Sequence, residues 1–124
     1  AKTKVAIVKG SKKPDEKEID GLVRKAIELA GGLADLVKRG DNVLIKPNIV
    51  LAKPVESAAI TDPIVCKTIA NMVRELGAKP VIGESSGVGY DTEEAIQTAG
   101  YGKLRGEGYE VVDLKKKGTE MVNL

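Results

Sequence analysis

Four short runs of aliphatic residues, each separated from the next by a segment long enough for a helix, constrain the fold of this chain more than any other feature. The runs cover residues 5–8, 43–45, 80–82 and 111–112. They are continuous rather than alternating with polar residues, which is typical of strands buried on both faces of a parallel sheet. The pattern therefore predicts an α/β chain whose parallel strands are joined by helical crossovers.

The segments between these runs carry helical signals. Apolar residues recur at spacings of three and four in residues 19–30 and 65–76. Asp15, Asp62 and Asp91 precede the predicted helices, and aspartate is a favoured N-cap residue. We predict one Rossmann-like α/β domain over residues 1–124, with three layers and a mainly parallel sheet of four strands, or five if residues 119–124 open another. The strand pattern continues to the last residues, which favours a fragment or a truncated domain.

Composition limits the classes of function. The 124 residues, 42% of them hydrophobic and 31% charged, are typical of a single globular domain. A net charge of only +2 argues against a nucleic-acid partner. No apolar run approaches the roughly 18 residues of a membrane span, and no signal peptide is evident. We expect a cytoplasmic protein with neither a nucleic-acid nor a membrane partner.

The residues that the chain lacks exclude further chemistry. There is no histidine, which excludes His-based acid–base catalysis, Ser-His-Asp triads and His-ligated metals. The single cysteine, Cys66, excludes an internal disulfide and an iron–sulfur cluster held by this chain alone. Cys66 lies in a predicted helix and is interpreted as a small core residue. The basic run at residues 115–117 is interpreted as a solvated turn.

Candidate ligand-binding residues follow the predicted second and third strands. Ligands of open parallel sheets bind outside the carboxyl ends of the strands. Lys46 and Asn48 stand at one such end and open a long connection. Lys46 either reaches over this rim toward an anion or only extends its ammonium group into water. Asn48 either faces a ligand or bonds the local backbone.

The loop after the third run is the other half of the candidate site. Glu84, Ser85, Ser86, Gly87 and Gly89 offer a carboxylate, two hydroxyls and two glycines within six residues. Glycines allow close approach of the backbone, and successive N–H groups can hold an oxyanion. Neither a Walker loop nor a GxGxxG fingerprint occurs. The alternative is a flexible Gly/Ser loop.

A metal is a second hypothesis for these loops. Asp62 and Glu84 could jointly hold a hard cation such as magnesium, which prefers oxygen ligands. The simpler interpretation of Asp62 is as the cap of its helix.

Several segments resemble the N-terminal part of the DUF362 family, whose function is unknown. They are VLIKPNIV, ITDPIV, ELGAKPVIGESSG, AGYGKL and YEVVDL, in that order. The resemblance runs from Lys4 to Leu114 and implies that the residues of the recurring pattern include Lys46, Pro47, Asn48, Thr61, Asp62, Pro63, Ser85, Ser86 and Gly87. It also implies longer relatives, many with a cysteine-rich, ferredoxin-like segment and an electron-transfer role. With one cysteine, these 124 residues depart from that pattern, so cluster binding is not carried over to them.

Three functions remain open from the sequence. The first is a domain that binds an anionic small molecule or cofactor at the carboxyl rim, within an iron–sulfur-associated redox protein. The second is a stand-alone, metal-assisted enzyme acting on a phosphate or carboxylate substrate. The third is an interaction module. The predicted last strand, residues 119–124, has no assigned neighbour, which predicts either a homodimer or a missing C-terminal domain.

Overall fold

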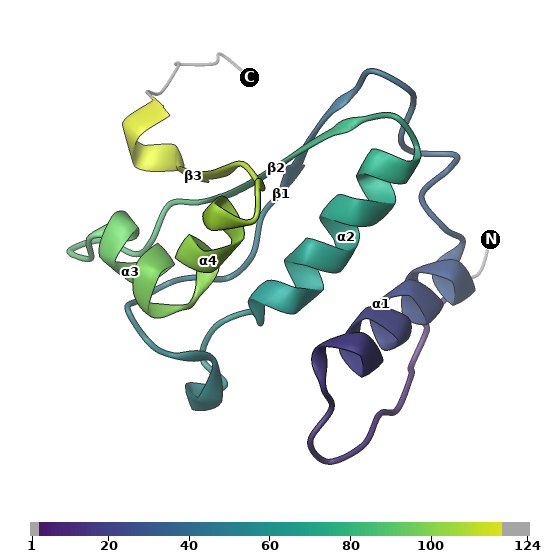
Figure 1. Cartoon of the computed structure of the whole chain (residues 1–124), viewed down its shortest axis with the longest axis horizontal. Helices are drawn as coiled ribbons and strands as arrows, with labels where there is room; N and C mark the ends of the chain where they lie inside the picture. Colours follow the sequence, from purple (N-terminus) through teal and green to yellow (C-terminus); the bar gives the residue numbers. More distant parts are fainter. Residues whose placement is uncertain (1–2, 118–124) are drawn as a thin grey trace.

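The computed structural model describes residues 3–117 (Figure 1). In chain order its main elements are α1 (Glu16–Ala30), β1 (Asn42–Ile45), α2 (Pro63–Glu75), β2 (Lys79–Glu84), α3 (Thr92–Thr98), α4 (Tyr101–Gly106) and β3 (Val111–Asp113). Two short 3-10 helices, η1 (Val55–Ser57) and η2 (Leu114–Lys117), follow β1 and β3. None of the helices within this range is long and apolar enough to cross a membrane.

The sheet is parallel, and its strands lie in the order β1-β2-β3. Ile45 of β1 lies beside Ile82 of β2, which lies beside Val111 of β3. These three residues face the same side because neighbouring residues in register share a face. The predicted α/β class and the parallel direction of the strands are therefore confirmed.

As predicted, an aspartate N-cap begins each of the helices α1, α2 and α3. Asp15 accepts a hydrogen bond from Glu18 N, Asp62 from Ile64 N and Asp91 from Glu94 N, each at 2.8 Å. Each cap satisfies a backbone donor that the helix itself leaves unpaired. Pro63 occupies the first turn of α2, where its missing N–H costs nothing.

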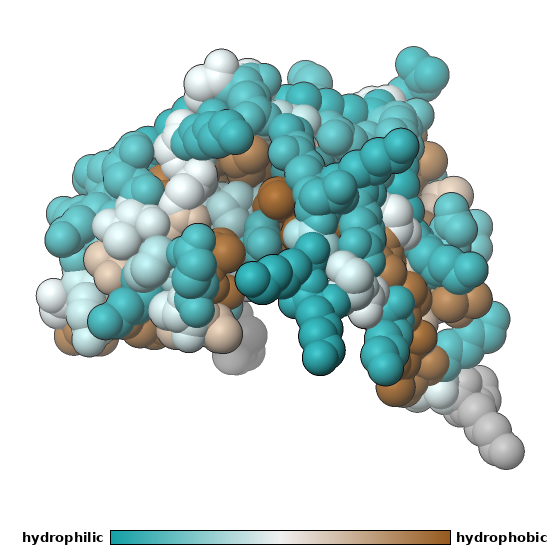
Figure 2. Space-filling view, turned by 60° about the horizontal axis from the view of Figure 1, so that its bottom comes forward, coloured by the Kyte–Doolittle hydropathy of each residue, from teal (hydrophilic) through white to brown (hydrophobic). Residues whose placement is uncertain are grey.

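The core lies on one face of the sheet. A single buried cluster joins the inward residues of the strands to α2, α3 and α4, and it includes Ile45, Ile82, Val111, Cys66, Ala70, Ile96, Tyr101 and Leu104. The opposite face carries Leu44, which is 55% exposed, with Val81 beside it in register. Helix α1 packs against α2. The face shown in Figure 2 is mainly hydrophilic, with hydrophobic side chains visible between polar ones in a few places.

The sheet is smaller than predicted. Residues 5–8 form no strand, and Val5 and Ile7 are 82% and 88% exposed. The segment before α1 instead runs alongside that helix (Figure 1). Ser11 N and Ser11 Oγ both donate to the Glu18 carboxylate. Within residues 3–117 the sheet thus has three strands; α2, α3 and α4 pack on one face, and only Leu114 of η2 lies near Gly83 and Leu44 on the other. The described residues therefore do not form the four-stranded, three-layer, Rossmann-like sheet. The predicted fifth strand, residues 119–124, lies outside the described residues.

Candidate functional site

The loops that follow β1 and β2 meet at the carboxyl rim of the sheet. Glu84, the last residue of β2, is 4% exposed. One of its oxygens, Oε2, lies 3.0 Å from Lys46 Nζ and accepts a 3.1 Å hydrogen bond from Ile49 N. The other, Oε1, accepts from Ser85 N at 2.7 Å. Two stretches that sequence analysis selected independently are therefore joined through one carboxylate.

The charge of Glu84 is stabilised although the side chain is buried. Burial raises the pKa of its carboxyl, but the hydrogen bonds from Lys46, Ser85 N and Ile49 N outweigh that effect, so the net pKa lies below its usual value. The Lys46 side chain is 59% exposed, so its ammonium group touches Glu84 on one side and solvent on the other. Lys46 thus both pairs with a buried charge and remains accessible at the rim.

The serine–glycine loop is attached to the connection after β1. Ser86 Oγ donates to Ile49 O at 2.6 Å, and Gly87 N donates to Val50 O at 3.0 Å. Ser86 N donates to Thr92 Oγ1 at 3.2 Å. The N–H groups of Ser85, Ser86 and Gly87 are thus used inside the protein, and the Ser85 residue itself is exposed to solvent.

Gly89 has a structural reason to be glycine. Its φ of +86° lies in the region that side chains disfavour. The neighbouring Val88 is fully exposed and Tyr90 is 51% exposed, so the loop places apolar side chains in solvent at the rim.

Asn48 closes the long connection rather than extending beyond it. Its N–H donates to Thr61 Oγ1 at 3.0 Å, its O accepts from Thr61 N at 2.9 Å, and its Nδ2 donates to Ala59 O at 3.0 Å. Tyr101 Oη donates to Thr61 O at 2.9 Å, which fixes the closed loop to α4. Asn48 is exposed, but its amide nitrogen is engaged by the loop backbone.

Cys66 is a core residue, as sequence analysis favoured. It is 2% exposed, and its Sγ lies 3.4 Å from Tyr101 Oη. Burial raises the pKa of the thiol and also that of the Tyr101 phenol, so both groups remain neutral near pH 7. A neutral, buried thiol is a poor nucleophile.

Strand β3 and the 3-10 helix η2 that follows it contribute residues that sequence analysis did not place in the site. Lys115 Nζ donates to Gly87 O at 3.3 Å and to Tyr90 O at 3.0 Å. Lys115 and Lys116 are exposed in η2, as predicted for a solvated turn, and Lys115 in addition supports the loop after β2. Asp113 is buried and is the register partner of Glu84. Its Oδ2 lies 3.6 Å from Lys116 Nζ. The signal was present, because a third parallel strand must also end at this rim.

The two residues predicted as a metal pair have other contacts. Asp62 caps α2 through Ile64 N, and Glu84 binds Lys46 and two backbone donors. Among residues 3–117 no three Asp, Glu, His or Cys side chains cluster in a way that could hold a metal ion. Metal binding by Asp62 and Glu84 stays a prediction that no contact supports.

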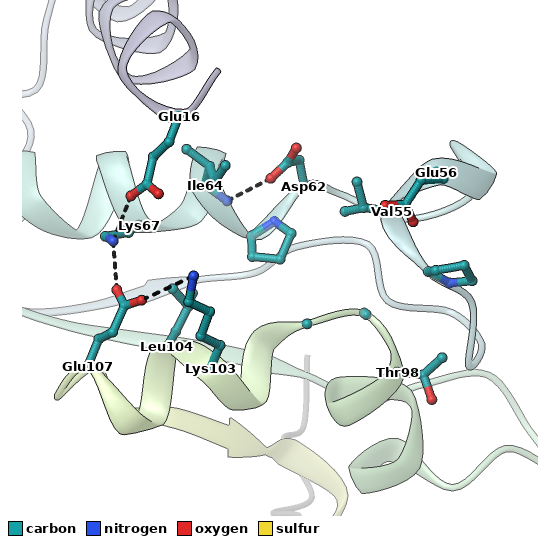
Figure 3. Close-up of a pocket in the computed structure, with 14 residues that line it drawn as sticks. Glu16, Val55, Glu56, Asp62, Ile64, Lys67, Thr98, Lys103, Leu104 and Glu107 are labelled. Atoms are coloured by element: carbon teal, nitrogen blue, oxygen red, sulfur yellow. Dashed lines mark hydrogen bonds and ion pairs between the residues drawn. The ribbon is translucent and has the colours of Figure 1, made fainter. Parts of the chain in front are cut away.

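A cavity of about 330 Å³ lies elsewhere, between η1, the start of α2 and the α3–α4 junction (Figure 3). Asp62 lines this cavity, whereas Lys46, Asn48 and the loop after β2 do not. This cavity and the rim selected from the sequence are therefore two separate features.

Comparison with known proteins decides the family. The family described as "Domain of unknown function (DUF362)" matches residues 43–124. The chain belongs to the DUF362 family. This DUF362 chain is 39% identical over 67 residues to a thylakoid-associated protein of Synechocystis sp., a match that covers 54% of the chain and 21% of that relative. The matched part thus spans about a fifth of the relative's length. No solved structure matches significantly.

The family match locates the rim within the DUF362 domain. It begins at Val43, in β1, and so includes all three strands and every rim residue described above. Helix α1 and the segment before it precede the match. The predicted family is confirmed over residues 43–124, whereas the resemblance was predicted to begin at Lys4. The part of this DUF362 chain that the family shares is the part that builds the rim.

Proposed function

We propose that this DUF362 domain binds an anionic small molecule or cofactor at the carboxyl rim of its sheet, through Lys46 and Lys115. One observation carries the proposal: these two lysines, from the ends of different strands, hold the two ends of one exposed loop. Lys46 contacts Glu84 at its start, and Lys115 contacts Gly87 and Tyr90 at its far end. Exposed Ser85 lies between these contacts in the chain.

The balance of charge at the rim supports an anion. Three ammonium groups, those of Lys46, Lys115 and Lys116, face two carboxylates, those of Glu84 and Asp113. The contacts of Lys115 are neutral carbonyl oxygens, which orient its ammonium group without cancelling its charge. One positive charge is thus in excess, and an anion that replaces water there gains charge-assisted hydrogen bonds.

The surroundings of the lysines indicate a ligand with an apolar part. Val50 and Tyr90 both pack near Gly87 and are 38% and 51% exposed. A ring or chain attached to the anion would lie against these side chains and shield the ion pair from water. In this proposal Asn48, Ser86, Gly87 and Gly89 maintain the loop conformations, while Lys46, Lys115 and Ser85 contact the ligand.

The test is a titration with inorganic phosphate, followed by ¹H–¹⁵N NMR at constant ionic strength. We expect amide shifts in residues 46–50 and 84–90. A charge-assisted hydrogen bond is worth about 1.5–3 kcal/mol. Lys46→Ala should therefore raise the dissociation constant about tenfold to a hundredfold.

Matched variants separate binding from stability. Lys79 is an exposed lysine at the opposite end of β2, so Lys79→Ala is the control and should bind as wild type does. Lys46→Arg keeps the charge beside buried Glu84 and should retain most of the affinity. Equal affinity of wild type and Lys46→Ala, or shifts confined to other regions, would contradict the proposal.

The remaining functional predictions rest on the family resemblance or on composition alone. An association with an iron–sulfur redox protein, a cytoplasmic location and a metal-assisted reaction stay predictions. The name of the Synechocystis relative describes that protein as thylakoid-associated. From this name we add the hypothesis that the present domain also associates with such a membrane system. No contact within residues 3–117 favours one of these over another.

A further inference from the structure

The cavity beside α2 has the size and lining of a small-molecule site. Its volume of about 330 Å³ lies at the lower end of the range that ligand pockets occupy. Pro54, Val55, Pro63, Ile64 and Leu104 give it an apolar wall. Four separate parts of the chain supply this lining, namely the start of α1, η1 with the residue before it, the first turns of α2, and the segment from the end of α3 through α4 (Figure 3).

The charged groups at one end of the cavity neutralise each other. Lys67 Nζ lies 2.7 Å from Glu16 Oε1 and 2.6 Å from Glu107 Oε2 (Figure 3). The other oxygen of Glu107 lies 3.9 Å from Lys103 Nζ. Two ammonium groups and two carboxylates therefore balance at this end.

The other end carries two more carboxylates. Glu56 of η1 and Asp62 at the start of α2 both line the cavity, so its lining has four acidic and two basic side chains. The helix dipole, equivalent to roughly half a positive charge at the N-terminus of α2, offsets only part of the charge of Asp62. The cavity as a whole is thus negative, the opposite of the rim.

We propose that this cavity binds an organic cation, a primary ammonium or guanidinium group on a short aliphatic chain. The chain would lie against the apolar wall formed by Pro63 and Leu104, and the cationic group would sit at the end that carries Glu56 and Asp62. The same chemistry occurs in free diamines and in lysine or arginine side chains of a peptide. This inference goes beyond the proposed function, because the two sites share no residue and select opposite charges.

The lining favours an organic cation over a metal ion. Hard metal ions take six or more oxygen ligands, and no cluster of three acidic, His or Cys side chains exists in the described part of the chain. An alkylammonium ion needs fewer charged contacts, and its aliphatic chain binds more tightly when apolar surface removes it from water. An apolar wall with carboxylates at one end meets both needs.

The test uses 1,5-diaminopentane and N-acetyl-lysine N-methylamide as probes, with pentan-1-ol as the uncharged control. Titrations are followed by ¹H–¹⁵N NMR at constant ionic strength. We expect both amines to shift residues 54–56, 62–67 and 98–104, and pentan-1-ol to bind at least tenfold more weakly. Tighter binding of the lysine derivative would identify a peptide side chain as the source, and tighter binding of the diamine a free diamine; each supports the proposal.

Substitutions test whether the carboxylates of Glu56 and Asp62 bind the cation. Glu56→Gln and Asp62→Asn should each weaken diamine binding about tenfold, as expected for loss of a charge-assisted contact. Asparagine caps helices as well as aspartate does, so Asp62→Asn retains the fold. Asp91→Asn, at the equivalent cap of α3 outside the cavity, is the matched control and should bind as wild type. Pentan-1-ol binding as tightly as the diamine, unchanged affinity in both variants, or shifts at the rim instead of the cavity would overturn the proposal.

Discussion

Glu84 shows at the residue scale how one side chain organises the rim. Ile82 and Glu84 are two positions apart on β2 and therefore share a face, which points the carboxylate toward the buried side. A buried carboxylate must be paired or hydrogen-bonded. The sequence could have predicted that Glu84 needs protein donors, but not that these are Lys46, Ser85 N and Ile49 N, because the folded connection after β1 brings two of them there.

Replacing Glu84 should destabilise the fold. Glu84→Gln removes the charge that Lys46 contacts and leaves one acceptor for two backbone donors, and an unsatisfied buried donor costs about 1–3 kcal/mol. We expect a loss of that size in the free energy of unfolding, measured by urea denaturation at pH 7. Glu110→Gln, at an exposed position, should change it by less than about 0.5 kcal/mol.

The same variant has a defined pH dependence. Because the pKa of Glu84 is lower in the folded protein, its ionised form stabilises the fold above the unfolded pKa of about 4.3. That contribution is lost as the pH falls through the folded pKa. The difference in stability between wild type and Glu84→Gln should therefore narrow below about pH 4.3; a difference that grows on acidification would contradict this assignment.

At the scale of elements, helices were more predictable than strands. Each predicted cap, Asp15, Asp62 and Asp91, begins a helix, because capping depends on residues close in sequence. Residues 5–8 have the composition of a strand but lie unpaired, because a strand also needs a neighbour that local sequence does not specify. Helix α1 likewise has apolar residues at helical spacing, yet none of its residues is buried.

Helix α1 should open more readily than α2. Its attachment includes polar contacts: Arg24 binds Glu75 at 2.8 and 3.0 Å, and Thr68 Oγ1 binds Asp20. Exposed ion pairs are worth about 0–1 kcal/mol and are screened by salt. We expect faster hydrogen exchange in α1 than in α2, and a further increase of about two- to fivefold in Arg24→Ala.

Mass spectrometry of hydrogen exchange measures this opening helix by helix. Lys25→Ala removes an exposed lysine from the same helix and is the control, which should exchange as wild type does. Exchange of α2 should change little in either variant, since Cys66, Ala70 and Val73 are buried in it. Equal protection of α1 and α2 in wild type would show that α1 belongs to the cooperative core.

Over residues 3–117 the molecule is a parallel sheet with helices α2, α3 and α4 on one face, while the other face carries only Leu114 of η2 near Gly83 and Leu44. The continuous apolar run at residues 43–45 predicted burial on both faces, but Leu44 is 55% exposed while Ile45 is buried. Local sequence indicates that a strand is apolar on both sides; it does not say which surface covers each side. The class of fold was therefore predictable and the number of strands and layers was not.

Parallel sheets are normally covered on both faces, so the open face is suited to contact with another apolar surface.

We predict that this face mediates self-association at high protein concentration, through Leu44, Val81 beside it on β2, and Val112, the register partner of Gly83. Leu44→Lys would place a charge in the contact, and burying an unpaired charge costs several kcal/mol, so the association constant should fall at least about tenfold. Leu29→Lys is the matched control, because Leu29 is 53% exposed but lies on α1. Sedimentation equilibrium over a series of concentrations measures both. A monomeric wild type, or equal association of the two variants, would show that the open face does not bind a second copy.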